Sequence, residues 1–325
     1  MTQTSGNIYR IPRRFNWFIV AGGFALLSLV LMLGRWGSGA VDAQGYYETG
    51  LWLRHEVPLS ALHAPYAYRL GVPALAAFIP GELHHVFGLL NWVFVTVGAC
   101  LATATVRRLG FGTQRALAAG LLLILSLPTV WYAPTPLADA GALCMRMLFV
   151  FGVLTGKPRV MLAAGLAATF ISEENILLLV WLLATERVER RRGWATVAAA
   201  GAWLIVVREW VAPGLPGATW LPGVDETLNL VTDWRGLLAL VACAGFALPL
   251  ALKGMRAAPQ RLEPLRGLLK LMAVPVLVAL FSVPVQGCIV WSLYPFLIPF
   301  AVAIGLPQRV EVRPEARQLR LVRGA

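Results

Sequence analysis

Long apolar runs recur throughout this chain of 325 residues, and they constrain its fold more than any other feature. Charged residues make up only 14% of the sequence, whereas they are about a quarter of an ordinary soluble domain. A helix needs about 20 predominantly apolar residues to cross the hydrocarbon core of a membrane. The sequence therefore predicts an all-α, polytopic membrane helix bundle that forms a single membrane-embedded domain over residues 1–325.

Eight of the apolar runs are predicted to be full spans. They cover Phe15–Gly34, Val86–Val106, Ala116–Tyr132, Leu137–Thr155, Trp194–Val211, Leu237–Leu252, Leu268–Val285 and Cys288–Leu306. Two shorter runs, Val160–Ile171 and Ile176–Ala184, predict a hairpin that enters the membrane and returns to the same side. A further short run, Leu70–Ile79, ends at Pro80 and Gly81 and is not expected to cross.

Basic residues are distributed unevenly between the segments that link these runs. Of the 28 Lys and Arg residues, 22 lie in segments predicted on one side, five lie on the other side, and Arg146 lies within a span. Cytoplasmic loops of membrane proteins carry an excess of Lys and Arg. We therefore expect cytoplasmic termini, a basic cytoplasmic tail at 307–325, and outer loops at 35–67 and 212–236. This distribution also explains the net charge of +12 without nucleic acid as a partner.

Ionisable residues also occur inside the apolar segments. A charged residue at the centre of a membrane helix costs roughly 2.5–3.5 kcal/mol on insertion scales, so Arg146 should face a partner. Candidate partners are Asp139, two turns earlier on the same face, and Glu173 and Glu174 at the tip of the predicted hairpin. Alternatively, Arg146 binds an anionic group such as a phosphate, and the two glutamates are solvated at the outer surface.

Aromatic and ionisable side chains are also concentrated in and just after the first outer loop. They are Asp42, Tyr46, Tyr47, His55, His63, Tyr66, Tyr68 and Arg69. Glu48 and His55 are seven residues apart, so a continuous helix would place them on one face. Aromatic rings at this depth can be interfacial anchors. A carboxylate directly after the first span is unnecessary for anchoring, and Asp42 therefore indicates a functional site.

Motifs of soluble enzymes and of metal sites are missing from the sequence. It contains no GxxxxGK[ST] phosphate-binding loop, no HExxH and no GxSxG. The four cysteines lie within apolar runs and form no CxxC pair. Any chemistry is therefore expected at the membrane surface or in a cavity between helices, and no metal ligands are assigned.

The order of the motifs between residues 10 and 190 resembles the GT-C superfamily of membrane glycosyltransferases. In VDAQGYYETGLWL, Asp42 followed by Tyr46 and Tyr47 is similar to the acidic residue and tyrosine that follow the first span in that family. In YAYRLGVPALAAF, Tyr68 and Arg69 match an aromatic-Arg-Leu-x-x-Pro stretch of bacterial relatives.

Further along the chain, PTPLADAGALCMRM and ISEENILLLV look similar to later family motifs, through Asp139 and through Glu173 or Glu174. The sequence departs from the family pattern at Ser172, where a basic residue is common, and it has no second acidic residue beside Asp42.

This resemblance implies inverting transfer of a sugar from a polyprenyl-phosphate donor to a glycan, lipid or protein acceptor on the outer face of a bacterial inner membrane. Asp42 would be the general base. The other candidate substrate-binding residues are Tyr46, Tyr47, His55, His63, Tyr68, Arg69, Asp139, Arg146, Glu173 and Glu174. Metal use varies in the superfamily, so a divalent cation stays open. The alternatives are a transporter or lipid flippase, and a non-catalytic membrane subunit of an envelope-assembly complex.

Overall fold

The computed structural model describes residues 15–39, 42–215, 232–256, 258–282 and 288–304, and over these ranges the chain is helical, without a β-strand. The all-α prediction is therefore confirmed. The predicted basic tail 307–325 and most of the predicted loop 212–236 lie outside the described residues. The cytoplasmic position of the termini accordingly stays a prediction.

The helices follow the apolar runs of the sequence. In chain order they are α1 (Trp17–Leu33), α2 (Ala43–Leu53), α3 (Gly71–Phe78), α4 (Leu83–Arg108), α5 (Thr113–Ile124), α6 (Leu127–Tyr132), α7 (Asp139–Thr155), α8 (Pro158–Ile171), α9 (Ile176–Ala184), α10 (Arg190–Val206), α12 (Trp234–Ala244), α13 (Ala247–Arg256), α14 (Glu263–Ser282), α15 (Cys288–Trp291) and α16 (Tyr294–Ala301). Three shorter segments matter for the site, namely the 3-10 turns η2 (Tyr66–Tyr68) and η3 (Glu173–Asn175) and the π-helical turn η4 (Val207–Val211).

Three helical segments of the described chain are long and apolar enough to cross a membrane. They are Leu83–Arg108, Arg190–Val211 and Gln260–Ser282, and the pair α12 and α13, bent by 56°, would make a fourth. Helices α1, α5 and α8 are apolar but have only 17, 12 and 14 residues. The eight full spans expected from the sequence are therefore not all continuous helices, and that number remains a prediction.

Three of the predicted spans are broken, and each break has a local cause. Between α5 and α6, Ser126 caps the N-terminus of α6. Pro128 in the first turn of α6 has no N–H, so it cannot continue the helical hydrogen bonds of α5. Between α12 and α13, Gly245 adopts φ 49° and ψ −145°, a conformation open to glycine. Between α15 and α16, Pro295 again interrupts the backbone hydrogen bonds.

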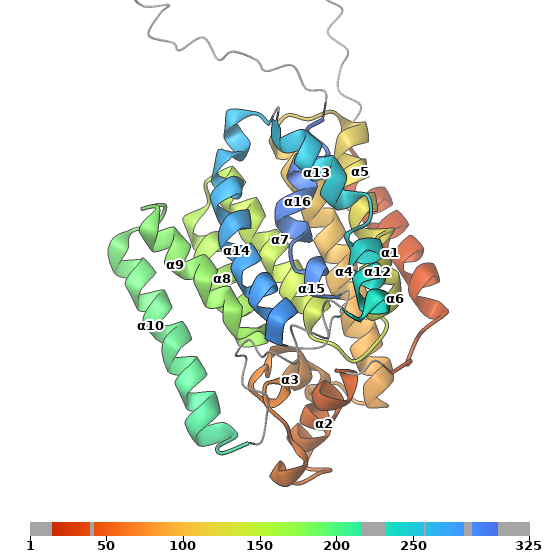
Figure 1. Cartoon of the computed structure of the whole chain (residues 1–325), viewed down its shortest axis with the longest axis vertical. Coiled ribbons are helices and arrows are strands. Elements are labelled where there is room, and N and C mark those ends of the chain that lie inside the picture. Colours follow the sequence, from red (N-terminus) through yellow and green to blue (C-terminus); the bar gives the residue numbers. More distant parts are fainter. Residues whose placement is uncertain (1–14, 40–41, 216–231, 257, 283–287, 305–325) are drawn as a thin grey trace, which may run out of the picture.

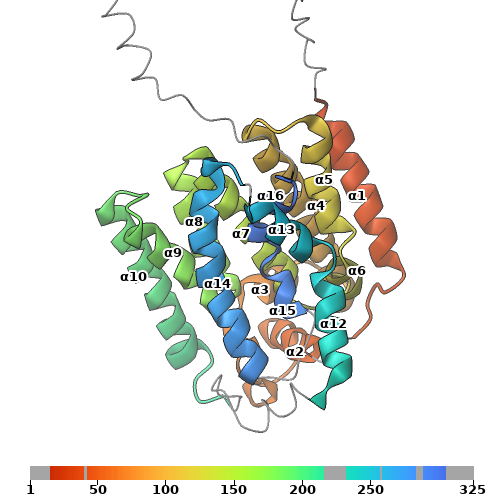
Figure 2. The same ribbon diagram turned by 45° about the horizontal axis from the view of Figure 1, so that its top comes forward.

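The bundle is built around α4 and α7, which pack against each other (Figure 1). Helix α5 packs against α4, helix α8 packs against α7, and α16 contacts both central helices. Figures 1 and 2 place α1 and α10 on opposite flanks of this centre. Buried side chains such as Phe149 and Phe296 fill one part of the core, and Leu123 and Trp291 fill another.

Close helix contacts depend on glycine. In lipid, apolar side chains gain little by leaving the solvent, so helices associate through tight packing of small residues. A Cβ at Gly120 would lie 2.4 Å from the Phe24 ring, and a Cβ at Gly254 would lie 1.9 Å from the backbone oxygen of Phe300. These contacts fix α1 against α5 and α13 against α16.

Helices α2 and α3 form a cap at one end of the bundle (Figure 1, bottom). The Arg54 guanidinium links the end of α2 to the end of α3. It donates to the carbonyl oxygens of Ala76, Ile79 and Gly81 at 3.1, 2.6 and 2.8 Å. A Cβ at Gly71 would lie 2.7 Å from the Ile171 side chain, so the start of α3 touches the end of α8. The cap therefore meets the hairpin tip, where the sequence placed its two glutamates.

Candidate functional site

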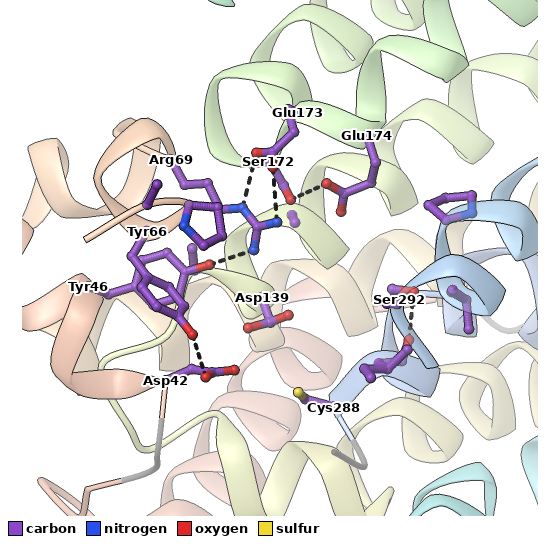
Figure 3. A pocket seen from close by; sticks show the side chains of 18 of the residues that line it. Asp42, Tyr46, Tyr66, Arg69, Asp139, Ser172, Glu173, Glu174, Cys288 and Ser292 are labelled. Carbon is purple, nitrogen blue, oxygen red and sulfur yellow. Dashed lines mark hydrogen bonds and ion pairs between the residues drawn. The ribbon is translucent and has the colours of Figure 1, made fainter. Parts of the chain in front are cut away.

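A cavity of about 750 Å³ lies between the cap and the helical bundle. Its walls come from α2, the segment through η2, α7, the hairpin tip, η4, α14 and α15 (Figure 3). The charged and polar side chains that line it are Asp42, Tyr46, His63, Tyr66, Arg69, Asp139, Arg146, Ser172, Glu173, Glu174, Arg208, Cys288 and Ser292. Ionisable groups from distant parts of the sequence thus share one chamber.

Asp42 lies just before α2 and faces this cavity. The Tyr66 hydroxyl donates a hydrogen bond of 2.6 Å to Asp42 Oδ1 (Figure 3). Burial raises the pKa of Tyr66 well above its usual value, and the hydrogen bond to Asp42 adds to this effect. Tyr66 reaches Asp42 because its ring lies against Gly45, where a Cβ would approach the ring to 2.3 Å. Tyr66 is therefore a neutral donor that orients the Asp42 carboxylate.

Arg69 connects the cap to the hairpin tip. Its Nε and Nη2 donate to the two carboxylate oxygens of Glu173 at 3.0 and 3.2 Å, and its Nη1 donates to the Tyr46 hydroxyl at 3.0 Å (Figure 3). Two parallel hydrogen bonds between a guanidinium and a carboxylate fix both groups in one plane. The side chains of Arg69 and Glu173 are 14% and 21% exposed, so this ion pair borders the cavity.

Arg146 is almost fully buried, with only 2% of its side chain exposed. Its Nη2 donates to Glu174 Oε1 at 2.7 Å, and its Nε donates to Asn175 Oδ1 at 2.5 Å. Its Nη1 donates to the backbone oxygen of Ser292 at 3.1 Å. In a continuous helix, the N–H of Phe296 would donate to the Ser292 oxygen. Here it donates to the backbone oxygen of Leu293 at the start of α16, so the Ser292 oxygen is free to accept from Arg146. The break between α15 and α16 thus supplies a ligand for the buried arginine.

The hairpin tip is held by its own polar side chains. Asn175, fully buried, donates to the backbone oxygens of Ala168 and Ser172 at 3.0 and 2.9 Å and so closes the end of α8. The Ser172 hydroxyl donates to Glu174 Oε2 at 2.5 Å. With 14 residues, α8 is about 21 Å long, which is shorter than a hydrocarbon core of about 30 Å. Glu173 and Glu174 line the cavity with side chains 21% and 26% exposed and are paired with arginines, so they are not fully solvated. Their depth in a membrane stays a prediction.

Asp139 opens α7 and also faces the cavity (Figure 3). The segment before it is fixed by Asn91 of α4, whose amide donates to the backbone oxygens of Thr135 and Leu137 at 2.9 and 3.1 Å. Arg146 takes Glu174 as its carboxylate partner, although Asp139 is the candidate on its own helix. Among the described residues, no hydrogen bond or ion pair is found at the Asp139 carboxylate.

Tyr47, His55 and Tyr68, which the sequence predicts in the site, do not line the cavity. The Tyr47 ring packs on His84, with ring centroids 3.9 Å apart, and the Tyr68 ring lies 5.3 Å from the Arg208 guanidinium carbon. The prediction that Glu48 and His55 share one helix face is wrong. Helix α2 ends at Leu53, and His55 is exposed and has φ 60°.

His63 does line the cavity, at its rim. Its side chain is 60% exposed, and its Nδ1 lies 4.0 Å from Glu48 Oε2. Of the remaining candidates, seven meet in the cavity: Asp42, Tyr46, Arg69, Asp139, Arg146, Glu173 and Glu174.

Sequence reasoning did not assign Tyr66, Ser172, Asn175, Arg208, Cys288 or Ser292 to the site. Arg208 lies on the π-helical turn η4, a local feature that often marks a functional site. Ser292 contributes a backbone oxygen, for which a sequence carries no signal beyond the nearby proline. Asn175 directly follows the two glutamates within an apolar stretch, and this position is the sequence signal that points to it.

The described part of the chain holds no group of three or more His, Cys, Asp or Glu residues arranged to bind a metal ion. The chain matches no protein-family model, and its sequence matches no curated protein.

Proposed function

We propose that this protein is a GT-C-type glycosyltransferase that moves a sugar from a polyprenyl-phosphate donor to a glycan, lipid or protein acceptor. One observation carries this proposal. Asp42, Arg69, Arg146, Glu173 and Glu174, which are far apart in the sequence, line one cavity beside the cap. A cavity lined by both ionisable and apolar residues suits a substrate with a charged head and a lipid tail.

The orientation in the membrane belongs to the same proposal. The protein is a multi-pass protein of a bacterial inner membrane, and the cap faces the periplasm. The distribution of 22 basic residues on one side and five on the other supports this orientation. The donor lipid then stays in the bilayer while its sugar reaches the cavity under the cap.

In the proposed reaction, the acceptor hydroxyl attacks the anomeric carbon of the donor sugar. Asp42 takes the hydroxyl proton as the new carbon–oxygen bond forms, and the bond from the anomeric carbon to the phosphate oxygen breaks. The lipid phosphate leaves with the electron pair, so the configuration at the anomeric carbon inverts. The hydrogen bond from Tyr66 holds Asp42 Oδ1 and directs the carboxylate toward the cavity.

Negative charge develops on the leaving phosphate, and fixed cations would stabilise it. Arg69 and Arg146 are each held by a glutamate, which offsets part of their charge. Arg208 also lines the cavity and has no carboxylate partner among the described residues. We therefore assign the phosphate contact first to Arg208, and to Arg69 and Arg146 as a second layer of positive charge.

The test is transfer by the purified protein in proteoliposomes that contain undecaprenyl-phosphate-linked hexoses and a panel of sugar acceptors. Asp42→Asn keeps the shape of the side chain and removes the base. We expect its kcat to fall by roughly 10²–10⁴, the usual contribution of general base catalysis. Glu56→Gln, an exposed carboxylate of the same outer segment, is the matched control and should retain full activity.

Undiminished transfer by the Asp42→Asn variant would refute the role of Asp42. The broken pair α8 and α9, with charges at its tip, also occurs in transporters. If vesicles show lipid scrambling or solute uptake but no sugar transfer with any donor, the transporter or flippase alternative holds. Co-purification with a larger envelope enzyme, together with tolerance of Asp42→Asn, would favour a non-catalytic subunit.

A further inference from the structure

We propose that the substrate carries a protonated amine near the reacting atoms, and that Asp139 is the residue that selects it. This inference rests on the proposed transferase function and adds a chemical class to its substrate. The amine belongs either to the donor sugar or to the acceptor.

Two of the three arginines in the cavity are paired with glutamate. Arg69 binds both carboxylate oxygens of Glu173, and Arg146 binds Glu174 at 2.7 Å. Each pair brings one positive and one negative charge, so the pairs add little net charge to the cavity. The third arginine, Arg208, lies on the π-helical turn η4.

The other two carboxylates, Asp42 and Asp139, are not matched in this way. Asp42 accepts a hydrogen bond from Tyr66, which is a neutral donor. At Asp139, the described residues provide neither a hydrogen bond nor an ion pair, and the charges that act on it are those of Arg69, Asp42, Glu174 and Arg146. Figure 3 shows the Asp139 carboxylate between the Arg69–Glu173 pair and Asp42.

The wall contributed by α14 does not offset these two carboxylates, because its lining residues Pro275, Val276, Val278 and Ala279 are apolar. Counted as ionised groups, the lining has three arginines and four carboxylates, so negative charge exceeds positive charge by one. Such a site favours a cationic group, because a charge-assisted hydrogen bond is about twice as strong as a neutral one. It disfavours a uronic acid, because like charges would meet at close range.

The donor arm of the test compares three undecaprenyl-phosphate-linked sugars that differ at one position: glucosamine, N-acetylglucosamine and glucose. The acceptor arm uses a neutral donor with chitosan, chitin and cellulose oligosaccharides of equal length. In one of the two arms we expect kcat/KM for the amine-bearing substrate to exceed that for its neutral counterparts about tenfold or more. The arm that shows the preference identifies the source of the amine.

Asp139→Asn should reduce this preference to about twofold or less while neutral substrates are still used, since the carboxamide keeps the shape but not the charge. Glu56→Gln is again the control, and its preference should not change. A second measurement needs no variant. The preference of the wild-type protein should disappear as the pH rises through the pKa of the substrate amine.

Equal use of amine-bearing and neutral substrates by the wild-type protein would overturn this inference and leave the transferase proposal intact. A preference that survives in Asp139→Asn, or that persists after the amine is deprotonated, would overturn it as well. If no donor is cleaved in either arm, the transferase proposal itself fails, and this inference fails with it.

Discussion

The buried pair between Arg146 and Glu174 offers a direct test of the site geometry. Arg146→Met keeps an apolar stem of similar length and removes three hydrogen bonds, to Glu174, Asn175 and the backbone of Ser292. Removing one partner of a buried ion pair costs about 3–5 kcal/mol, because the other charge is left uncompensated. The Glu174 side chain is 26% exposed toward the cavity, so water offsets part of this cost. We therefore expect a loss near the lower end, about 3 kcal/mol.

The assay is reversible unfolding in mixed dodecyl maltoside and SDS micelles, followed by tryptophan fluorescence. A matched control is Arg192→Met. Arg192 forms an ion pair with Glu189 at 2.9 Å, but the two side chains are 64% and 56% exposed. Exposed pairs contribute about 0–1 kcal/mol, so this control should barely change the free energy of unfolding.

A double-mutant cycle separates the ion pair from the other contacts of Arg146. In the Arg146→Met/Glu174→Gln variant no charge is left unpaired at this position. Its cost should therefore be smaller than the sum of the two single losses, by about 1.5 kcal/mol or more. Typical interhelical hydrogen bonds in membrane proteins couple by only about 0.6 kcal/mol. Additive losses, or a loss below about 1 kcal/mol in Arg146→Met, would refute a buried pair at this position.

Two further predictions concern packing and titration. Gly254→Ala should destabilise the protein by about 1–3 kcal/mol, because the new Cβ would meet the backbone oxygen of Phe300. The control Gly201→Ala places its Cβ where no atom lies within 4 Å, so it should be neutral or slightly stabilising in the same unfolding assay. In a spectrophotometric titration near 295 nm, Tyr66→Phe should leave unchanged the number of tyrosines that ionise near pH 10, because burial, aided by the hydrogen bond to Asp42, keeps the pKa of Tyr66 above that range. One fewer tyrosine titrating near pH 10 in this variant would contradict the buried environment of Tyr66.

The apolar runs of the sequence were sufficient to predict the helices but not their continuity. A hydropathy pattern reports where the chain prefers lipid or protein to water, and the runs around Ser126, Gly245 and Pro295 are apolar on both sides of each break. The breaks depend on single residues that change the backbone hydrogen bonds. Where a side chain of another helix binds a freed backbone group, as Arg146 binds the Ser292 oxygen, its position follows only from the tertiary packing.

The candidate site was predictable to the extent that a charge in an apolar segment requires a partner. This requirement predicts that Arg146 lies near Glu173 and Glu174, and the structure brings them together. It could not decide between Asp139 and Glu174 as the partner of Arg146, because spacing along one helix says nothing about the depth of a neighbouring hairpin. In the outer loop, the position of a side chain depends on where α2 ends, which the sequence pattern does not show. His55 lies just past that end and turns outward.

The irregular segments of the backbone indicate that the polar part of the cavity is not a packing defect. In a lipid environment, backbone that departs from a helix is tolerated where it is buried in protein or lines a polar cavity. Here the hairpin tip contributes Glu173 and Glu174, the π-helical turn contributes Arg208, and the break before α16 contributes the Ser292 oxygen that binds Arg146. An empty packing defect would be lined by apolar side chains, without charged groups on its walls. The coincidence of three backbone irregularities with one set of charges therefore indicates that the helices are interrupted in order to place polar groups in this cavity.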